Sequence, residues 1–482
     1  MRGRIAPGGP TEVEMKIGCR VIGIMVLLVA ATLAAGQSDA SLRDASGPDL
    51  LSCSPAPCVL PPTQASEGGA EVTDTPIVAD PLNPLHLLLG STDFNCLFPS
   101  LSGFHISSDG GSTWSVYCMP IIQDFQGHVF WPGGEPGVGY DLNGTAYIAG
   151  DYGDSEGLGY GLVAVQKSTD GVNWSQPAVA LSGGYSAVLD GWMAVDTSAS
   201  SPYVNSLYVT AGLVGDQSGS EELIVSHSHD GGATWHQTDV AGIQRTPAGD
   251  VYPNLTVDNK GELYLAWMYC DSGPFYFCSN NKGNMVFSKS TDGGNTWTTP
   301  TLMATIVLGL GIPNTNVGDE DYPAIAVDNS DGPYAGNLYV VMYTWTGIYM
   351  RVQVIRSTDG GNTWSKPVPV APGITHDQFF PWISVSPTGL VGVSWLDRRN
   401  DPNNVNYQAF AAISSDGGRS FQPNVQLTTK FSNPNNNGGP DDRWMGDYSG
   451  NTWDGPDYFI AAWMDSSNGV DMQEEVGGIR LK

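Results

Sequence analysis

Carboxylates are the side chains of this sequence whose placement first suggests chemistry. They gather at two points of a repeating pattern, before a short motif with Pro or Gly in second place and after the apolar segment that follows it. The first group is Asp74, Glu135, Asp190, Asp250, Asp319, Glu320, Asp321, Asp377, Asp441, Asp442 and Asp447, and the second is Asp93, Asp151, Asp271, Asp397 and Asp465. Crowded carboxylates raise one another's pKa values, which suits a general acid acting on a glycosidic oxygen, and the same groups are able to bind Ca²⁺. The alternative is that they cap strand ends and face solvent.

Arginines are scarce, and several lie near the same points. They are Arg245, Arg351, Arg398, Arg399 and Arg443. Guanidinium groups that converge from neighbouring elements bind a substrate carboxylate in a bidentate manner. The alternative is pairing within the protein, with Arg398 held by Asp397 or Asp401, and Arg443 held by the two aspartates before it.

One turn sequence, SSDGGSTW at 107–114, fixes the elements that must position these groups. It returns at 168–174, 228–235, 290–297, 357–364 and 414–421, with aspartates 57 to 67 residues apart. We interpret each copy as a hairpin turn: the Asp accepts hydrogen bonds from the turn's own amides, the glycines take positive φ, and the Trp packs under the turn. Six copies at a near-constant period predict a repeat architecture.

This turn resembles the Asp-box found in sialidases and many other secreted β-propellers. The resemblance covers roughly residues 70–482 and implies a fold, not an activity, because the turns are structural.

A second motif has the same period and begins the first strand of each unit. Its copies are Thr75–Asp80, Glu135–Asp141, Asp190–Asp196, Tyr252–Asp258, Tyr322–Asp328, Phe380–Ser386 and Met445–Asn451. Short β-branched and aromatic runs follow each copy, which predicts four strands per unit.

Seven first strands against six Asp-boxes predict an all-β, seven-bladed propeller in residues 71–482, with six blades as the alternative known from sialidases. The last unit ends before a fourth strand. Because a closed ring leaves no sheet edge unpaired, we expect an N-terminal segment around Ala65–Thr73 to supply that strand. The start of the first strand and the end of the second then lie on the face opposite the Asp-boxes, where a functional site is expected.

The sialidase resemblance also implies site residues. Its nucleophile is a tyrosine late in the chain paired with a glutamate, and Tyr448 with Glu320, beside Asp321, are the nearest analogues. The substrate-binding set is then Arg245, Arg351, Arg398 and Arg443, with Trp382 as a stacking surface. One departure stands against a true sialidase: the family's Phe-Arg-Ile-Pro motif is missing, and no arginine lies between Arg43 and Arg245. The alternative for Tyr448 is a residue packed in the channel.

The N-terminus predicts export. Lys16 and Arg20 precede an apolar run that ends before Gln37, which is typical of a cleaved signal peptide over 1–36, followed by a Ser/Pro/Gly-rich leader over 37–70. A membrane anchor is the alternative, although the run is short for spanning a bilayer.

Six cysteines then remain, and proximity favours the pairs Cys53–Cys58, Cys96–Cys118 and Cys270–Cys278, as expected outside the cytosol. A metal site is disfavoured because no His lies at ligand spacing from them.

A net charge of −29 excludes nucleic acid and anionic membranes as partners, because phosphate binding needs clustered Lys and Arg. The remaining expectation is a secreted monomer that binds a glycan or polysaccharide and requires no cofactor. Two functions fit: a sialidase-like glycoside hydrolase, exo-acting on glycans that include acidic sugars, and a non-catalytic propeller that binds a polysaccharide or protein through the same face. Fold alone does not choose between them.

Overall fold

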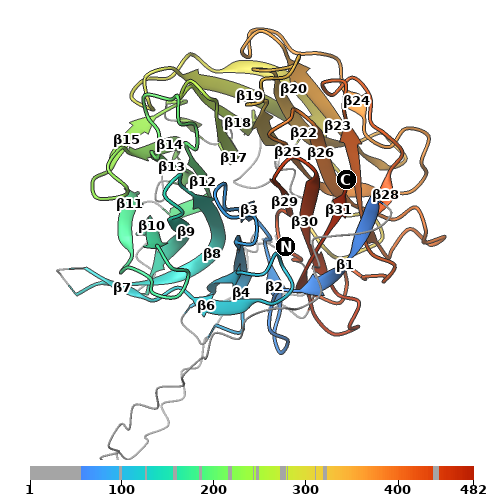
Figure 1. Cartoon of the computed structure of the whole chain (residues 1–482), viewed down its shortest axis with the longest axis horizontal. Coiled ribbons are helices and arrows are strands. Elements are labelled where there is room, and N and C mark those ends of the chain that lie inside the picture. The colour runs from blue at the N-terminus through green and yellow to red at the C-terminus, as the bar shows by residue number, and fades with distance from the viewer. Residues whose placement is uncertain are drawn as a thin grey trace, which may run out of the picture. The chain divides into compact units, whose positions relative to one another are not determined.

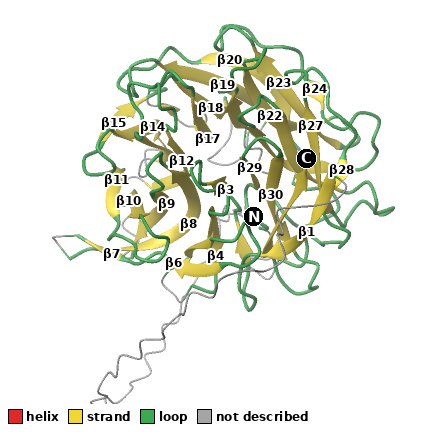
Figure 2. Cartoon of the chain, viewed as in Figure 1, coloured by secondary structure: helices red, strands yellow, loops and turns green. Residues whose placement is uncertain are grey.

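Seven antiparallel sheets are arranged as the blades of a propeller (Figure 1). The computed structural model describes residues 56–96, 100–124, 127–155, 160–183, 187–214, 220–242, 244–245, 249–271, 278, 280–309, 311–318, 323–437 and 444–482. Figure 2 shows strands and loops only, and across these ranges no helix long and apolar enough to cross a membrane is found. The all-β prediction and the seven blades are therefore confirmed, and the expected signal peptide at 1–36 lies outside the described residues.

The first three blades follow one another along the chain. Blade 1 consists of β2 (Val72–Thr73), β3 (Ile77–Ala79), β4 (Leu87–Asp93), β5 (Ser102–Ser107) and β6 (Ser115–Cys118). Blade 2 consists of β7 (Ile122–Gln123), β8 (Val129–Tyr140), β9 (Ala146–Asp154), β10 (Gly161–Ser168) and β11 (Ala178–Ser182). Blade 3 consists of β12 (Ala187–Val195), β13 (Leu207–Val214), β14 (Ser220–Ser228), β15 (His236–Asp239) and β16 (Gln244–Arg245).

The other four blades have four strands each. Blade 4 is β17 (Gly249–Val257), β18 (Leu263–Cys270), β19 (Lys282–Ser290) and β20 (Thr301–Val307). Blade 5 is β21 (Ala324–Val327), β22 (Leu338–Trp345), β23 (Met350–Ser357) and β24 (Val368–Pro369). Blade 6 is β25 (Gln378–Val385), β26 (Val391–Asp397), β27 (Gln408–Ser414) and β28 (Val425–Gln426). Blade 7 is β29 (Gly450–Asp454), β30 (Tyr458–Asp465), β31 (Gln473–Arg480) and β1 (Cys58–Gln64).

Strand β1 closes the ring. It pairs antiparallel with β31, from Cys58 opposite Arg480 to Gln64 opposite Glu475, and so becomes the outer strand of blade 7. The sequence predicted such a closure but placed it around Ala65–Thr73. The closing strand is instead Cys58–Gln64, so part of the expected leader belongs to a blade, while Val72–Thr73 pair in blade 1.

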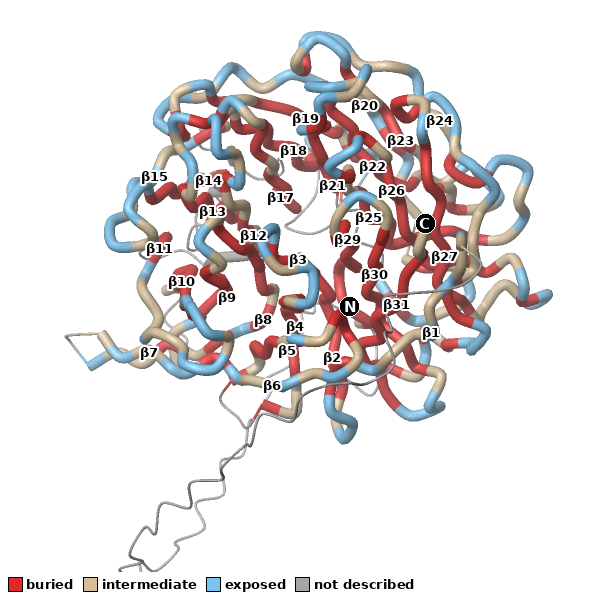
Figure 3. The backbone as a smooth tube through the Cα atoms, viewed as in Figure 1, coloured by how far each residue is buried: buried red, intermediate tan, exposed pale blue. Residues whose placement is uncertain are grey.

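The first strand of every blade faces the central channel. Contacts link these strands into a closed circle, β3 to β8, β12, β17, β21, β25, β29 and back to β3. Buried residues follow the strands, whereas exposed residues follow the connecting loops (Figure 3). Apolar side chains fill the junctions between blades: Tyr208 and Val225 of blade 3, for example, share a cluster with Trp267 and Val286 of blade 4.

Each Asp-box forms the turn between the third and fourth strands. In the copy at 290–297, Thr296 N donates to Asp292 Oδ1 at 2.9 Å and the Thr296 hydroxyl donates to Oδ2 at 2.6 Å. Gly293 and Gly294 have φ of 73° and 95°, so the glycines are required by the backbone. Tyr203, in the turn between the first two strands of blade 3, lies against Gly293 of blade 4. The two kinds of turn therefore share one face, which leaves the starts of the first strands on the other.

Two of the predicted disulfides are present, Cys96–Cys118 and Cys270–Cys278. Each links the end of one strand of a blade to a nearby loop or strand of the same blade. Cys58 is also disulfide-bonded, and its predicted partner Cys53 lies outside the described residues.

Candidate functional site

Three aromatic rings meet inside the channel on the face opposite the Asp-boxes. Tyr448 precedes β29, Trp192 lies on β12 and Trp382 on β25, so the rings come from blades 7, 3 and 6. The ring centroids are 4.8 Å apart for Trp192 and Trp382, 5.6 Å for Trp192 and Tyr448, and 5.8 Å for Trp382 and Tyr448. Blades that are not neighbours in the ring thus touch through these side chains. Tyr448 and Trp382 are buried and Trp192 is half-buried, so Trp192 offers the accessible surface.

Tyr448 is held as a neutral donor. Its hydroxyl donates to the Pro136 carbonyl of blade 2 at 3.0 Å. Burial raises the pKa of Tyr448 well above its usual value, and the charges of nearby carboxylates raise the pKa further. A phenol in this state is a poor nucleophile, because attack requires the phenolate or an adjacent base. Its contacts are those of a packed channel residue.

Four carboxylates lie close enough to this phenol for their charges to raise its pKa. Those that act on the pKa of Tyr448 are Asp74, Glu135, Asp447 and Asp151. They come from blades 1, 2 and 7, and all four belong to the acidic groups found at the two repeated points of the sequence. We call them, together with Tyr448, the channel acid cluster. Glu135 is half-buried, whereas the other three carboxylates are buried.

Asp74 is the most constrained member of the channel acid cluster. The Asp447 amide donates to Asp74 Oδ1 at 2.7 Å, which ties the start of blade 1 to blade 7. Burial raises the pKa of Asp74 to about 6, although hydrogen bonds from Asp447 and other groups oppose the shift. Asp74 therefore exchanges its proton near neutral pH, whereas an exposed Asp has a pKa near 4.

The backbone around the start of the first-strand motif is unusual in several blades. Asp74, Glu135, Tyr252 and Phe380 have φ of 60°, 49°, 58° and 48°, and each lies six residues before the end of the first-strand motif. In blades 2, 4 and 6 the pairing with the second strand shifts register at the same place. Left-handed backbone is costly for residues other than glycine and recurs at functional sites. The sequence signal for this feature is the Pro or Gly that follows, but the sign of φ is not readable from it.

Protein groups bind part of the guanidinium of Arg351 and of Arg398, while Nε and Nη2 of Arg398 have no hydrogen-bond partner among the described residues. Arg398 is fully buried: its Nη1 donates to the Pro313 carbonyl at 2.6 Å and lies 3.4 Å from Asp377 Oδ2. Burial lowers the pKa of Arg398 to about 10. Arg351 Nη1 donates to the Met350 carbonyl at 2.7 Å and also to the His376 carbonyl. Arg351 and Arg398 therefore bind adjacent residues, His376 and Asp377. Protein groups occupy one nitrogen of each guanidinium.

The pairing expected for Arg398 is different in the structure. Its partner is Asp377 of the preceding loop, not Asp397 or Asp401. Arg399 instead takes Asp397, with Nε at 2.9 Å from Oδ1 and Nη2 at 2.6 Å from Oδ2. Arg398 and Arg399 point to opposite sides of the chain. The prediction for Arg398 was therefore wrong, because it considered only carboxylates close in sequence.

For four of the predicted site residues, the structure does not describe the side chain. Glu320, Asp321 and Arg443 lie outside the described residues. Arg245 is in β16, which pairs with β14 opposite Ser220, and its side chain lies outside the description. Across the described ranges, no group of three or more His, Cys, Asp and Glu is arranged to hold a metal ion.

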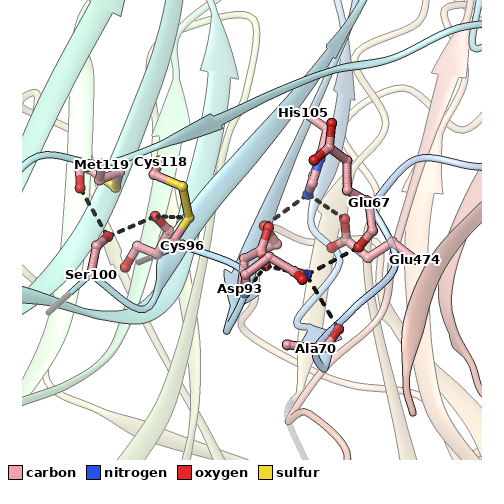
Figure 4. The surroundings of a disulfide bond; sticks show 12 residues. Glu67, Ala70, Asp93, Cys96, Ser100, His105, Cys118, Met119 and Glu474 are labelled. Atoms are coloured by element: carbon pink, nitrogen blue, oxygen red, sulfur yellow. Dashed lines mark hydrogen bonds and ion pairs between the residues drawn. A yellow bond between two sulfur atoms is a disulfide. The ribbon is translucent and has the colours of Figure 1, made fainter. Parts of the chain in front are cut away.

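A second buried polar group, missed by sequence reasoning, lies where blade 1 meets blade 7 (Figure 4). His105 Nε2 of β5 is 2.8 Å from Glu474 Oε2 of β31, and both side chains are fully buried. Burial, with the charges of Asp93 and Asp74, raises the pKa of Glu474 well above its usual value, and burial lowers the pKa of His105 to about 4. The proton therefore stays on the carboxyl. The only sequence signal was the pair of adjacent glutamates in the last strand.

Comparisons with known proteins give fold relatives. No family model matches the chain, and no curated protein matches it. Among solved structures, a protein of unknown function from Dyadobacter fermentans matches with a TM-score of 0.47 at 14% identity, covering 76% of this chain and 98% of that one. A Hadza microbial sialidase matches with a TM-score of 0.44 at 15% identity, covering 79% and 73%. An α-L-arabinofuranosidase from Fusarium graminearum matches with a TM-score of 0.45 at 12% identity, covering 72% and 92%.

Proposed function

We propose that this protein is a glycoside hydrolase whose active site is the channel acid cluster, on the face opposite the Asp-boxes. The observation that carries the proposal is that Asp74, Glu135, Asp151 and Asp447 lie close enough to Tyr448 for their charges to raise its pKa. Asp74 is hydrogen-bonded to the Asp447 amide, and Tyr448 to the carbonyl of Pro136, which follows Glu135. Glycoside hydrolysis needs two carboxyl groups, one protonated and one ionised, on either side of the glycosidic bond. A cluster in which the pKa of Asp74 reaches about 6 holds both forms at once near neutral pH.

Exposure selects Glu135 as the carboxyl group that reaches the substrate. It is half-buried, whereas the other members of the cluster are buried. Its amide donates to the Thr92 hydroxyl at 3.1 Å, which fixes the backbone that carries it. We assign Glu135 the acid or base role and give Asp74 the role of setting the protonation of its neighbours. Trp192, the half-buried ring of the aromatic group, supplies a face on which a sugar ring stacks.

Charge favours a neutral sugar over an acidic one. A carboxylated substrate at this cluster meets carboxylates from three blades, while the guanidinium groups of Arg351 and Arg398 already bind protein carbonyls. Like charges in a partly buried site repel strongly. Arg245 and Arg443 remain the proposed ligands if the substrate carries a carboxylate, and Glu320 and Asp321 remain proposed acids of the same face.

Tyr448 takes a supporting role in this proposal. Its hydroxyl orients the Pro136 carbonyl beside Glu135 and leaves no phenolate for covalent attack. Tyr448→Phe should therefore reduce turnover only modestly, by less than about tenfold, because one neutral hydrogen bond contributes about 1 kcal/mol. A complete loss of turnover with an unchanged melting temperature would restore the nucleophile role.

The test is a Glu135→Gln variant assayed on a panel of aryl glycosides of neutral sugars, with sialosides included. Loss of a general acid or base should lower kcat by about 10²- to 10⁴-fold. Glu262→Gln is the matched control. Glu262 accepts a hydrogen bond from the Tyr264 hydroxyl at 2.8 Å on the Asp-box face, away from the channel acid cluster, so its turnover should match that of the unaltered protein. Equal losses in both variants, or none in either, would refute the site.

The second candidate is a binding propeller without catalysis, and one observation favours it. Tyr448, Arg351 and Arg398 are each held by the protein's own carbonyl groups, as in a packed scaffold. This function predicts no turnover on any glycoside, together with saturable glycan binding that Trp192→Ala weakens. A glycan array on the purified chain separates the two.

The disulfides are consistent with an oxidising compartment. We propose secretion with removal of residues 1–36, after which the intact mass should show a chain that begins near Gln37 and does not alkylate unless reduced.

A further inference from the structure

A cavity of about 400 Å³ lies at the junction of blades 3 and 4, separate from the channel acid cluster. Blade 4 provides most of its wall, and Ala241, just after β15, provides the blade 3 side. The wall residues from blade 4 are Asp250, Trp267, Tyr269, Asn284, Val286, Pro300, Thr301 and Leu302. They follow one face of the sheet, since Asp250 lies opposite Tyr269 on β18, and Tyr269 lies opposite Asn284 on β19.

The polar end of this cavity is a single buried carboxylate. Asp250 is 4% exposed, and its Oδ1 accepts the indole N–H of Trp267 at 2.5 Å. Its Oδ2 is also buried and has no hydrogen-bond partner among the described residues. Leaving a buried carboxylate oxygen unsatisfied is costly, so an atom that donates to Oδ2 stabilises the protein when it enters the cavity.

The rest of the cavity is apolar, aromatic or neutral. Trp267 and Tyr269 provide the rings, Val286, Pro300 and Leu302 provide aliphatic surface, and none of the described residues lining the cavity is a lysine or arginine. Two further negative charges act on groups of the site: Asp239 acts on the pKa of Asp250, and Asp271 acts on the pKa of Tyr269. The described charges at the cavity are therefore negative, and its walls contain π-faces.

We propose that the cavity between blades 3 and 4 binds a small organic cation, a primary or substituted ammonium with an apolar group. The ammonium donates to Asp250 Oδ2, and the apolar group lies against Trp267 and Tyr269. An ammonium next to aromatic rings gains cation–π attraction in addition to the ion pair. This site does not depend on the glycosidase proposal.

Two other ligand classes fit less well. An anion would face Asp250 with no cation among the described lining residues to balance it. A neutral sugar needs several donors and acceptors. The Thr305 hydroxyl already donates to Asn284 Oδ1 at 2.9 Å, and the Trp267 indole N–H already donates to Asp250. A ligand with a strong donor and a compact apolar body matches the unpartnered Oδ2 of Asp250.

The interaction should depend on pH. Burial raises the pKa of Asp250 to about 6, against the hydrogen bond from Trp267, and the charge of Asp239 adds to the rise. Binding needs the carboxylate, so affinity should be full at pH 7.5 and about tenfold lower at pH 5 as Asp250 takes up a proton. The other groups facing the site are Tyr269, which burial keeps neutral because it raises the pKa, and Asp271.

The experiment uses ligand-observed ¹⁹F NMR on the full chain with 4-fluorobenzylamine, and with 4-fluorobenzyl alcohol as the neutral isostere. The amine should bind at least tenfold more tightly than the alcohol at pH 7.5. Asp250→Asn should remove this preference, because the amide keeps an acceptor for Trp267 but loses the charge. Asp454→Asn is the matched control: burial also raises the pKa of Asp454 to about 6, but Asp454 ends β29 in blade 7, so binding should not change.

A second variant covers the case in which Asp250→Asn fails to fold. Leu302 is 60% exposed at the edge of the cavity, so Leu302→Arg places a cation there with little effect on folding. It should weaken binding of the amine at least fivefold and leave the alcohol unchanged. Equal affinities for amine and alcohol, or amine binding that survives in Leu302→Arg and Asp250→Asn, would overturn the proposal. Absence of amine binding at millimolar concentration in the unaltered protein would do the same.

Discussion

The two faces of the propeller use aspartate in opposite ways. On the Asp-box face each box aspartate is saturated by its own turn, as Asp359 is by the Thr363 amide and hydroxyl, and these hydrogen bonds lower its pKa. On the other face burial raises the pKa of Asp74 to about 6. One face repeats the same interactions in six turns, while the other brings different residues from each blade to the channel. Repetition here marks structure, and divergence among blades marks the candidate site.

The largest expected effect concerns Arg398, which separates a structural arginine from a substrate ligand. Arg398→Met leaves Asp377 buried with only the Met350 amide and Asn404 side chain as close donors among the described residues, so unfolding free energy should fall by about 3 kcal/mol. Chemical denaturation measures this. Arg419→Met is the control, because that exposed guanidinium stacks on Tyr334 at 5.0 Å on the Asp-box face and should contribute less than about 0.5 kcal/mol. Full stability in Arg398→Met with loss of glycan binding would instead make it a ligand.

The next effect concerns the pH dependence of stability. The folded pKa of Asp74 is raised above the unfolded value, so its contribution to stability is present below about pH 4 and is lost as pH rises to about 6. A shift of this size corresponds to roughly 3 kcal/mol. Asp74→Asn should therefore flatten the stability profile between pH 4 and pH 6.

Asp359→Asn provides the opposite sign for the same measurement. Hydrogen bonds lower the folded pKa of Asp359, so its contribution is present above the unfolded value and is lost as pH falls through the folded pKa. Urea unfolding at pH steps from 3 to 7 compares the two variants. Profiles that change in the same direction would show that the two faces do not differ as argued.

The smallest effect concerns a single Asp-box. Asp292→Ala removes the acceptor for the Thr296 amide and hydroxyl, and because the turn is largely exposed, water replaces part of what is lost. The expected cost is about 1 to 2 kcal/mol in unfolding free energy. Glycan binding or turnover at the channel should be unchanged. If activity disappeared while the melting temperature held, the Asp-box face would be the functional one.

The repeats made the fold predictable. Six Asp-boxes and seven first-strand motifs indicate hairpin turns and short strands. Such elements are set by residues close together in sequence, so they can be predicted without knowledge of distant contacts. The ring closure was predicted in kind for the same reason, since an unpaired edge needs a partner. Its position was not: the choice of Cys58–Gln64 over residues nearer the first blade depends on pairing with β31, at the other end of the chain.

The candidate site was predictable only in composition. The sequence by itself determined that carboxylates, arginines and aromatic residues gather at one face, because their place in each repeat sets the face. Which of them touch was decided by the closed ring, which packs Trp192, Trp382 and Tyr448 from three blades together, pairs Arg398 with Asp377, and buries His105 against Glu474. Burial and long-range contact set these pKa values and pairings, and neither is a property of residues close together in sequence.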